Sequence, residues 1–191
     1  MEDRVETMLR VPQDPDAANA RGDRPLAEAS MGGHLEVVRL LLEAGADKDL
    51  PIRNGNTSLM LACQSNHSDV VRELLQVGAS TDYATKDGAT ALMLAAGGGH
   101  VESVRLLLAA GANTNLATCQ SGFTALMLSA QLGHAEVVGL LLEAGADKDV
   151  PTVDGVTALM LTSEKGHASV VRVLLEATLL PRRQPLYNFS K

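Results

Sequence analysis

All five histidines of this 191-residue chain lie at nearly equal intervals along the sequence. They occupy positions His34, His67, His100, His134 and His167, which gives steps of 33, 33, 34 and 33 residues. A fixed period of this length is typical of a stacked repeat protein, in which each unit is covered by its neighbours. We therefore predict a solenoid rather than a domain with one central core.

The same sequence motif recurs around each histidine. Its most complete form is Gly-x-Thr-Ala-Leu-Met-Leu, a stretch of small residues, and then Gly-His-x-x-x-Val-x-x-Leu-Leu-x-x-Gly-Ala. Alignment on the histidines predicts five units, at residues 19–49, 50–82, 83–115, 116–149 and 150–180.

The two ends depart from this pattern. We expect residues 1–18 to form an N-terminal capping helix and a linker, because the apolar residues at 2–10 resemble the second helix of a missing half-unit. Residues 181–191 leave the repeat abruptly and are expected to be a C-terminal tail. The tail is either disordered or folded back on the last helix pair through Leu186, Tyr187 and Phe189.

Each unit is predicted to hold two helices, of which the first is short. It begins at a threonine, whose hydroxyl can accept a free backbone N–H; the residues are Thr57, Thr90, Thr124 and Thr157. It ends at a residue suited to positive φ; the residues are Asn66, Gly99, Gly133 and Gly166. These two signals delimit the first helix in four of the five units.

The second helix follows each histidine and has one apolar face, as at Val38, Leu41 and Leu42. Glycines flank the segment that leads to the next unit, so we expect an extended connection with a glycine turn, projecting from one edge of the stack. The glycine spacing widens by one residue between Gly111 and Gly122, which predicts an enlarged loop near Cys119, Gln120 and Ser121. Repeats tolerate such insertions on the edge that binds.

The order of turn, Thr-capped short helix, Gly-His and Val/Leu helix resembles the ankyrin repeat over residues 19–180. The resemblance implies an all-α ankyrin-repeat solenoid of stacked helix-turn-helix units with projecting hairpin loops. The family's Thr-Pro-Leu-His is here Thr-Ser-Leu-Met or Thr-Ala-Leu-Met. We expect the methionines to stack as an apolar ladder, formed by Met60, Met93, Met127 and Met160. The resemblance also implies that each Gly-His histidine bridges to a neighbouring loop by hydrogen bonds.

Charge and hydropathy disfavour several classes of partner. The net charge of −7 argues against a nucleic-acid groove, because phosphate binding needs a concentrated Lys/Arg face. No stretch approaches the ~20 apolar residues of a membrane span, and the charged N-terminus does not resemble a secretion signal.

Cys63 and Cys119 lie nearly two repeats apart, too far to form a disulfide, and free thiols indicate a reducing compartment. We expect a soluble cytosolic protein, with the nucleus as the alternative.

The chemistry-bearing residues do not predict a catalytic or metal site. Equivalent histidines in adjacent units should lie about 8–10 Å apart, whereas zinc ligands must converge to within about 4 Å. The pair Cys63 and His67 has no orienting group and is separated by the helix stop at Asn66. The run Gly97-Gly98-Gly99 lies at a predicted helix end and lacks the lysine of a phosphate loop. We therefore expect no metal and no cofactor.

The resemblance implies that a partner binds the projecting tips and the exposed end of each first helix. The variable tip residues are Arg53, Asn54, Asn56, Lys86, Asp87, Gln120, Ser121, Phe123, Val153, Asp154 and Val156. The adjoining helix edge carries Gln64, Ser65, Gln131, Leu132, Glu164 and Lys165. We predict Phe123 to be the main anchor, because it is the only aromatic residue in units four and five.

These observations predict a non-enzymatic scaffold or adaptor that binds another protein through its concave loop-and-helix face. We expect the chain to be monomeric and to bind no nucleic acid, membrane or metal. Two alternatives stay open. The chain could be the regulatory ankyrin segment of a larger multidomain enzyme, with catalysis outside residues 1–191, or a structural spacer without a dedicated ligand.

Overall fold

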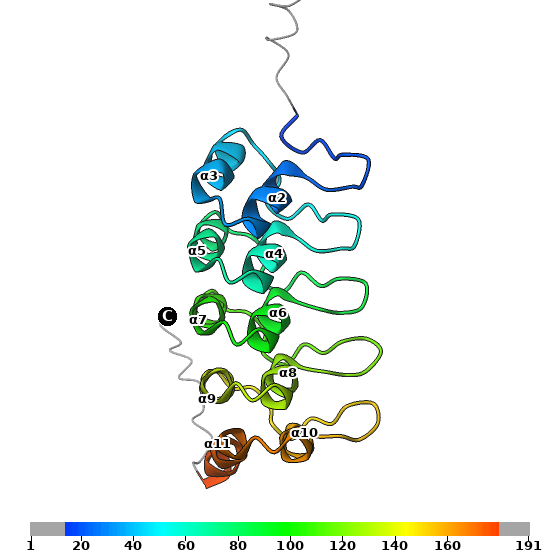
Figure 1. Ribbon diagram of the computed structural model, residues 1–191, viewed down its shortest axis with the longest axis vertical. Coiled ribbons are helices and arrows are strands. Elements are labelled where there is room, and N and C mark those ends of the chain that lie inside the picture. Colours follow the sequence, from blue (N-terminus) through cyan, green and yellow to red (C-terminus); the bar gives the residue numbers. More distant parts are fainter. Residues whose placement is uncertain (1–13, 180–191) are drawn as a thin grey trace, which may run out of the picture.

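The computed structural model describes residues 14–179, which form five pairs of helices joined by projecting loops (Figure 1). The pairs are α2 (Pro25–Met31) with α3 (Leu35–Glu43), α4 (Ser58–Gln64) with α5 (Ser68–Gln76), α6 (Ala91–Gly97) with α7 (Val101–Ala109), α8 (Ala125–Gln131) with α9 (Ala135–Glu143), and α10 (Ala158–Lys165) with α11 (Ala168–Leu179). The capping helix predicted at residues 2–10 and the predicted tail lie outside the described residues.

The helices form two parallel rows along the long axis of the molecule (Figure 1). The even-numbered helices, here called the inner row, lie next to the projecting loops, and the odd-numbered helices form the outer row on the other side. Each helix packs against the next one in its own row and against its partner in the pair. This arrangement confirms the predicted all-α solenoid. No helix within residues 14–179 is both long and apolar enough to cross a membrane.

The inner helices begin where the threonine pattern predicts. Each threonine Oγ1 accepts a hydrogen bond from the backbone N–H of the methionine three residues later, at 3.3–3.4 Å; the threonines are Thr57, Thr90, Thr124 and Thr157. In the first unit Arg24 makes no side-chain cap, and Pro25 at the first helical position provides a helix start that needs no N–H.

The Gly-His turns have the predicted left-handed backbone. Gly99 has φ 69°, and Asn66, at the corresponding position of the second unit, has φ 61°. Asn66 is the only described residue other than glycine with a positive φ, which agrees with the tolerance of asparagine for this conformation. The turn reverses the chain, so the two helices of a pair run antiparallel.

The core is a continuous layer of Leu, Val, Ala and Met between successive units. Met60, Met93 and Met127 expose only 1%, 2% and 1% of their surface, as predicted for the apolar ladder. Met160 is an exception, because it exposes 58% of its surface. The prediction was wrong at this position: within the described residues no sixth helix pair covers α10, so the last methionine of the series faces outward.

The hairpin of the fourth unit is longer than that of the third by one residue, as the glycine spacing predicts. Its closing hydrogen bond runs from Thr118 N to Phe123 O at 2.9 Å, whereas the third hairpin closes from Thr85 N to Ala89 O at 2.9 Å. The extra residue lengthens the tip and leaves the preceding and following helices in register.

Candidate protein-interaction surface

The histidines connect successive units, as the resemblance implies. Four of the five rings donate through Nε2–H to the carbonyl oxygen of the last residue of the preceding inner helix; the pairs are His67 with Met31 at 3.1 Å, His100 with Gln64 at 3.2 Å, His134 with Gly97 at 3.0 Å and His167 with Gln131 at 3.0 Å. These bonds hold the C-terminal ends of the inner helices at a fixed spacing. The helix-edge candidates lie at these ends.

The His134 ring also packs closely on the turn of the preceding unit. A Cβ added at Gly99 would lie 2.7 Å from His134 Nδ1, which is closer than real Cβ contacts allow. Gly99 therefore serves both the left-handed turn and the close approach of the next histidine. The Gly-His pair thus positions the edge of the proposed surface without contributing chemistry to it.

Backbone hydrogen bonds join neighbouring hairpin tips. Cys119 N donates to Asp87 O at 2.9 Å between the third and fourth hairpins, and Val153 N donates to Ser121 O at 3.1 Å between the fourth and fifth. At the other end of the stack, Arg24 Nε donates to Pro51 O at 3.3 Å. The third, fourth and fifth tips are therefore joined in series by backbone hydrogen bonds, in addition to the turns within each hairpin.

Most predicted contact residues are exposed along this edge of the molecule. The exposed ones are Arg53, Asn54, Gln64, Lys86, Asp87, Gln120, Ser121, Leu132, Val153, Asp154, Glu164 and Lys165. Five are half-buried, namely Asn56, Ser65, Phe123, Gln131 and Val156. Leu132 and Val153 expose 54% and 72% of their surface, so the surface includes apolar side chains that lie in solvent.

Phe123 is held more firmly than the sequence suggests. Its ring packs against the core, and its backbone N–H donates to Thr118 Oγ1 at 2.9 Å. The side chain therefore supports the enlarged hairpin, and only part of its ring can reach a partner. Leu132, which follows the C-terminal end of α8, is a more accessible apolar contact.

Sequence reasoning missed one apolar residue at this edge. Met31 is exposed at the end of α2, at the position that Gln64 and Gln131 occupy in later units. The spacing of the units aligns Met31 with these residues, although the first unit departs from the repeated motif.

The charged candidates are mixed in sign. Arg53 and Lys86 carry positive charge at the second and third tips, while Asp87 and Asp154 carry negative charge at the third and fifth. At the end of α10, Lys165 Nζ pairs with Glu164 Oε1 at 2.9 Å. The surface therefore has no concentrated field of either sign.

The thiol of Cys63 is not available for chemistry. Cys63 is buried in α4, and burial raises its pKa to about 12, so the group is a neutral thiol at pH 7. His67 Nε2 is already bonded to Met31 O. Cys119 is exposed on the fourth hairpin, and both cysteines are free.

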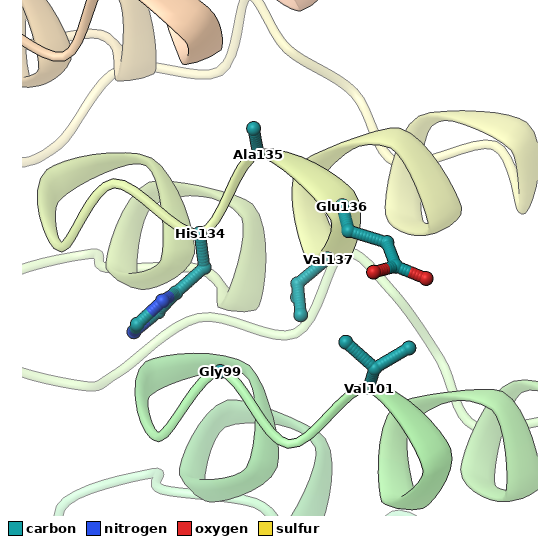
Figure 2. Close-up of a pocket in the computed structure, with 6 residues that line it drawn as sticks. All are labelled: Gly99, Val101, His134, Ala135, Glu136 and Val137. Atoms are coloured by element: carbon teal, nitrogen blue, oxygen red, sulfur yellow. The ribbon is translucent and has the colours of Figure 1, made fainter.

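A shallow recess of about 180 Å³ lies between the Gly-His turns of the third and fourth units (Figure 2). Figure 2 shows Val101 and Val137 facing each other across it, with the His134 ring over Gly99 on one side. Its polar groups are already paired, because Glu136 binds Arg105 at 3.1 Å and His134 bonds to Gly97 O. The recess is also smaller than the roughly 300–1,000 Å³ typical of ligand pockets.

Metal ligation has no candidate constellation in the part of the chain that the structure describes. No group of three His, Cys, Asp or Glu side chains there could hold an ion. The histidines instead act singly, each at one boundary between units.

Comparison with known families agrees with the geometry. A family model described as ankyrin repeats (3 copies) matches residues 1–87 and 77–152, and one described as ankyrin repeat matches residues 154–180. Comparison of the whole chain with curated proteins gives no significant match. Because the family matches cover most of the sequence, this chain belongs to the ankyrin repeat family, whose repeats are generally protein–protein interaction modules and typically not catalytic.

Proposed function

We propose that residues 19–180 act as one non-enzymatic scaffold that binds another protein through its hairpin tips and the adjoining ends of the inner helices. This surface is called here the tip surface, and it consists of the predicted contact residues together with Met31. The observation that carries the proposal is the pair of backbone hydrogen bonds between neighbouring tips, Cys119 N to Asp87 O and Val153 N to Ser121 O.

Fixed tips lower the entropic cost of binding. Ordering a mobile, rotamer-rich side chain at an interface costs about 0.5–1.5 kcal/mol, so a surface ordered before binding loses less on association. The histidine bridges and the bonds between tips provide this order on both edges of the tip surface. The variable side chains of the tip surface are thereby held at fixed positions relative to one another.

The apolar part of the tip surface supports a protein partner over a small polar ligand. Leu132 is exposed at the C-terminal end of α8, next to Gln131, and Val153 is exposed at the fifth tip, next to Asp154. Protein interfaces commonly combine an apolar centre with a polar rim. We therefore propose that Leu132 and Val153 contribute most of the binding energy, with Phe123 in a supporting position.

The first test compares two substitutions at equivalent helix ends. Leu132 and Val77 are both exposed and both follow the last residue of a helix, but Leu132 is on the inner row and Val77 on the outer row. Affinity capture from a native lysate with Leu132→Ser should lose a protein that wild type and Val77→Ser both retain. Rebinding of that purified protein should be weakened roughly tenfold or more by Leu132→Ser, as for an interface hot spot.

Unchanged melting curves of both variants provide the control for folding. Equal binding by Leu132→Ser and wild type would contradict the proposed surface. A partner lost only on Val77→Ser would move the binding site to the outer row.

A further inference from the structure

Within residues 14–179, the last helix pair carries apolar side chains that no further helix pair covers. Leu159 and Met160 expose 37% and 58% of their surface, and Val171 is half-buried. The equivalent residues of the fourth unit, Leu126, Met127 and Val138, expose at most 1%, because the fifth pair covers them. We call the surface formed by Leu159, Met160 and Val171 the end face.

Two hydrogen-bond acceptors near the end face correspond to acceptors that bind a donor of the next unit at the internal boundaries. Gln131 O bonds to His167 Nε2 at 3.0 Å, and no group in residues 14–179 donates to Glu164 O, its equivalent one unit later. Asn115 Oδ1 accepts Asp147 N at 2.9 Å, whereas the equivalent Asp149 carboxylate accepts only the adjacent Lys148 Nζ among the described donors. The end face therefore offers acceptors as well as apolar surface.

The charges around the end face favour a basic occupant. The exposed carboxylates of α10, α11 and the loop before α10 are Asp147, Asp149, Asp154, Glu164 and Glu176, against three cations, the half-buried Lys148 and the exposed Lys165 and Arg172. The segment that follows α11, residues 180–191, has the opposite balance, with Arg182, Arg183 and Lys191 and no acidic residue. This segment also carries Leu186, Tyr187 and Phe189 in a chain that has only four aromatic residues.

The segment begins close enough to reach the end face. Because α10 and α11 are antiparallel, the C-terminal end of α11 returns towards the N-terminal half of α10, which holds Leu159 and Met160. Tyr187 follows the end of α11 by eight residues, a reach of up to roughly 25 Å when extended. A helix is only about 10–12 Å across with its side chains.

We propose that residues 180–191 dock on the end face, with Leu186, Tyr187 and Phe189 covering Leu159 and Met160 and with Arg182 and Arg183 facing the surrounding carboxylates. In this position the segment covers the fifth pair in the way that each internal pair is covered by the pair that follows it. This inference does not depend on the proposed partner surface, since the end face lies at the end of the stack.

The test uses the Met160 methyl group as a probe in the full chain, labelled with carbon-13 at the methionine methyls. We expect nuclear Overhauser contacts from the Met160 methyl to the rings of Tyr187 or Phe189, together with an upfield shift of the methyl signal. The variant Tyr187→Ser/Phe189→Ser should lose both signals. The control Gln184→Ser/Asn188→Ser changes two polar residues of the same segment and should keep them.

The buried Met127 methyl provides an internal standard, because an unchanged Met127 signal shows that the stack is folded. A second readout is oxidation by peroxide, which should convert Met160 to the sulfoxide several times faster in the aromatic double variant than in wild type. A Met160 signal that is identical in all three proteins would overturn the proposal. A Met160 signal that depends on protein concentration would assign the end face to a second copy, and would also overturn it.

Discussion

The boundary between the third and fourth units and the boundary between the fourth and fifth differ on the outer row. At the former, Arg105 on α7 pairs with Glu136 on α9 at 3.1 Å, as Arg72 on α5 pairs with Glu102 on α7 at 2.8 Å. At the latter, Gly139 stands on α9 where the arginine would be, and Ser169 stands on α11 in place of the glutamate. Because both members of the ion pair are replaced, no such pair joins α9 to α11 among the described residues.

The interrupted row lowers the stability of the last boundary by a small amount. An exposed ion pair contributes about 0–1 kcal/mol, and a glycine inside a helix costs about 1 kcal/mol relative to alanine. A linear stack derives its stability from the units and from the contacts between neighbours. The fifth pair is therefore expected to open more easily than the pairs enclosed on both sides.

The inner row differs between these regions as well. The small-residue position held by Ala62 and Ala95 becomes Ser129 in α8 and Thr162 in α10. Ser129 Oγ lies 3.0 Å from both Ala125 O and Leu126 O, so its buried hydroxyl is paired. Thr162 Oγ1 is buried without a partner among the described residues, which costs about 1–3 kcal/mol for an unpaired group. Ser103 Oγ on α7 is likewise buried without a partner among the described residues, so this cost is not confined to the last boundary.

The largest effect should come from truncating equivalent methionines on either side of the last boundary. Met127→Ala should lower the free energy of unfolding by about 2–5 kcal/mol, because a buried side chain leaves a cavity. Met160→Ala should cost less than half as much, since most of that side chain is exposed. Urea denaturation followed by circular dichroism measures both, and equal losses would contradict the difference in burial.

A pH-dependent effect should arise in the second unit and be absent from the fifth. Burial raises the pKa of Cys63 from 9.0 to about 12, whereas the equivalent residue in α10 is the exposed Ser163. Above pH 9 the unfolded chain loses the thiol proton while the folded protein keeps it, so stability should fall as pH rises towards 12. The slope should approach about 1.4 kcal/mol per pH unit, the value for a difference of one bound proton.

The variant Cys63→Ala isolates this contribution, since alanine occupies the same position in α6 and α8. Above pH 9, the free energy of unfolding of wild type should fall relative to that of Cys63→Ala. Parallel stability curves for the two proteins between pH 8 and pH 11 would contradict the assigned pKa.

The smallest effect should follow from restoring the interrupted ion pair. Gly139→Arg/Ser169→Glu should slow amide hydrogen exchange in α10 and α11 by up to roughly fivefold, equivalent to about 1 kcal/mol for one exposed ion pair between α9 and α11. A Cβ added at Gly139 meets nothing within 4 Å, so the new side chain has room. Exchange in α4 to α7 should change little.

Gly139→Ala separates the two contributions, because it restores helix propensity without a charge. Exchange that slows equally throughout the stack would contradict a separate opening of the fifth pair. An effect of Gly139→Ala as large as that of the double variant would assign the whole gain to the helix.

The predictions that depend on local chemistry agree with the structure. Threonine caps, left-handed turns at Gly99 and Asn66, and the longer fourth hairpin follow from the preferences of a few adjacent residues. These features recur at a fixed period, so each unit supports the assignment of the others. The ladder of buried methionines was predicted equally well for the three units that have a neighbour on both sides.

Predictions that depend on a particular neighbour were less successful. Met160 has the same local sequence as Met127, yet it is exposed because it lies at the end of the described stack. Phe123 is predicted to anchor a partner, and its ring also packs on the core, a contact that the sequence did not indicate. The surface residues of the tips were found by position, but the hydrogen bonds between tips were not visible in the sequence.

The sequence by itself determined the repeat period, the helix limits and the edge from which the hairpins project, because caps, turns and apolar faces depend on residues a few positions apart. Only the tertiary structure decided which member of each repeated set is buried, paired or exposed. Burial and pairing require a second unit at the correct distance, and identical residues therefore differ between the interior and the end of the stack.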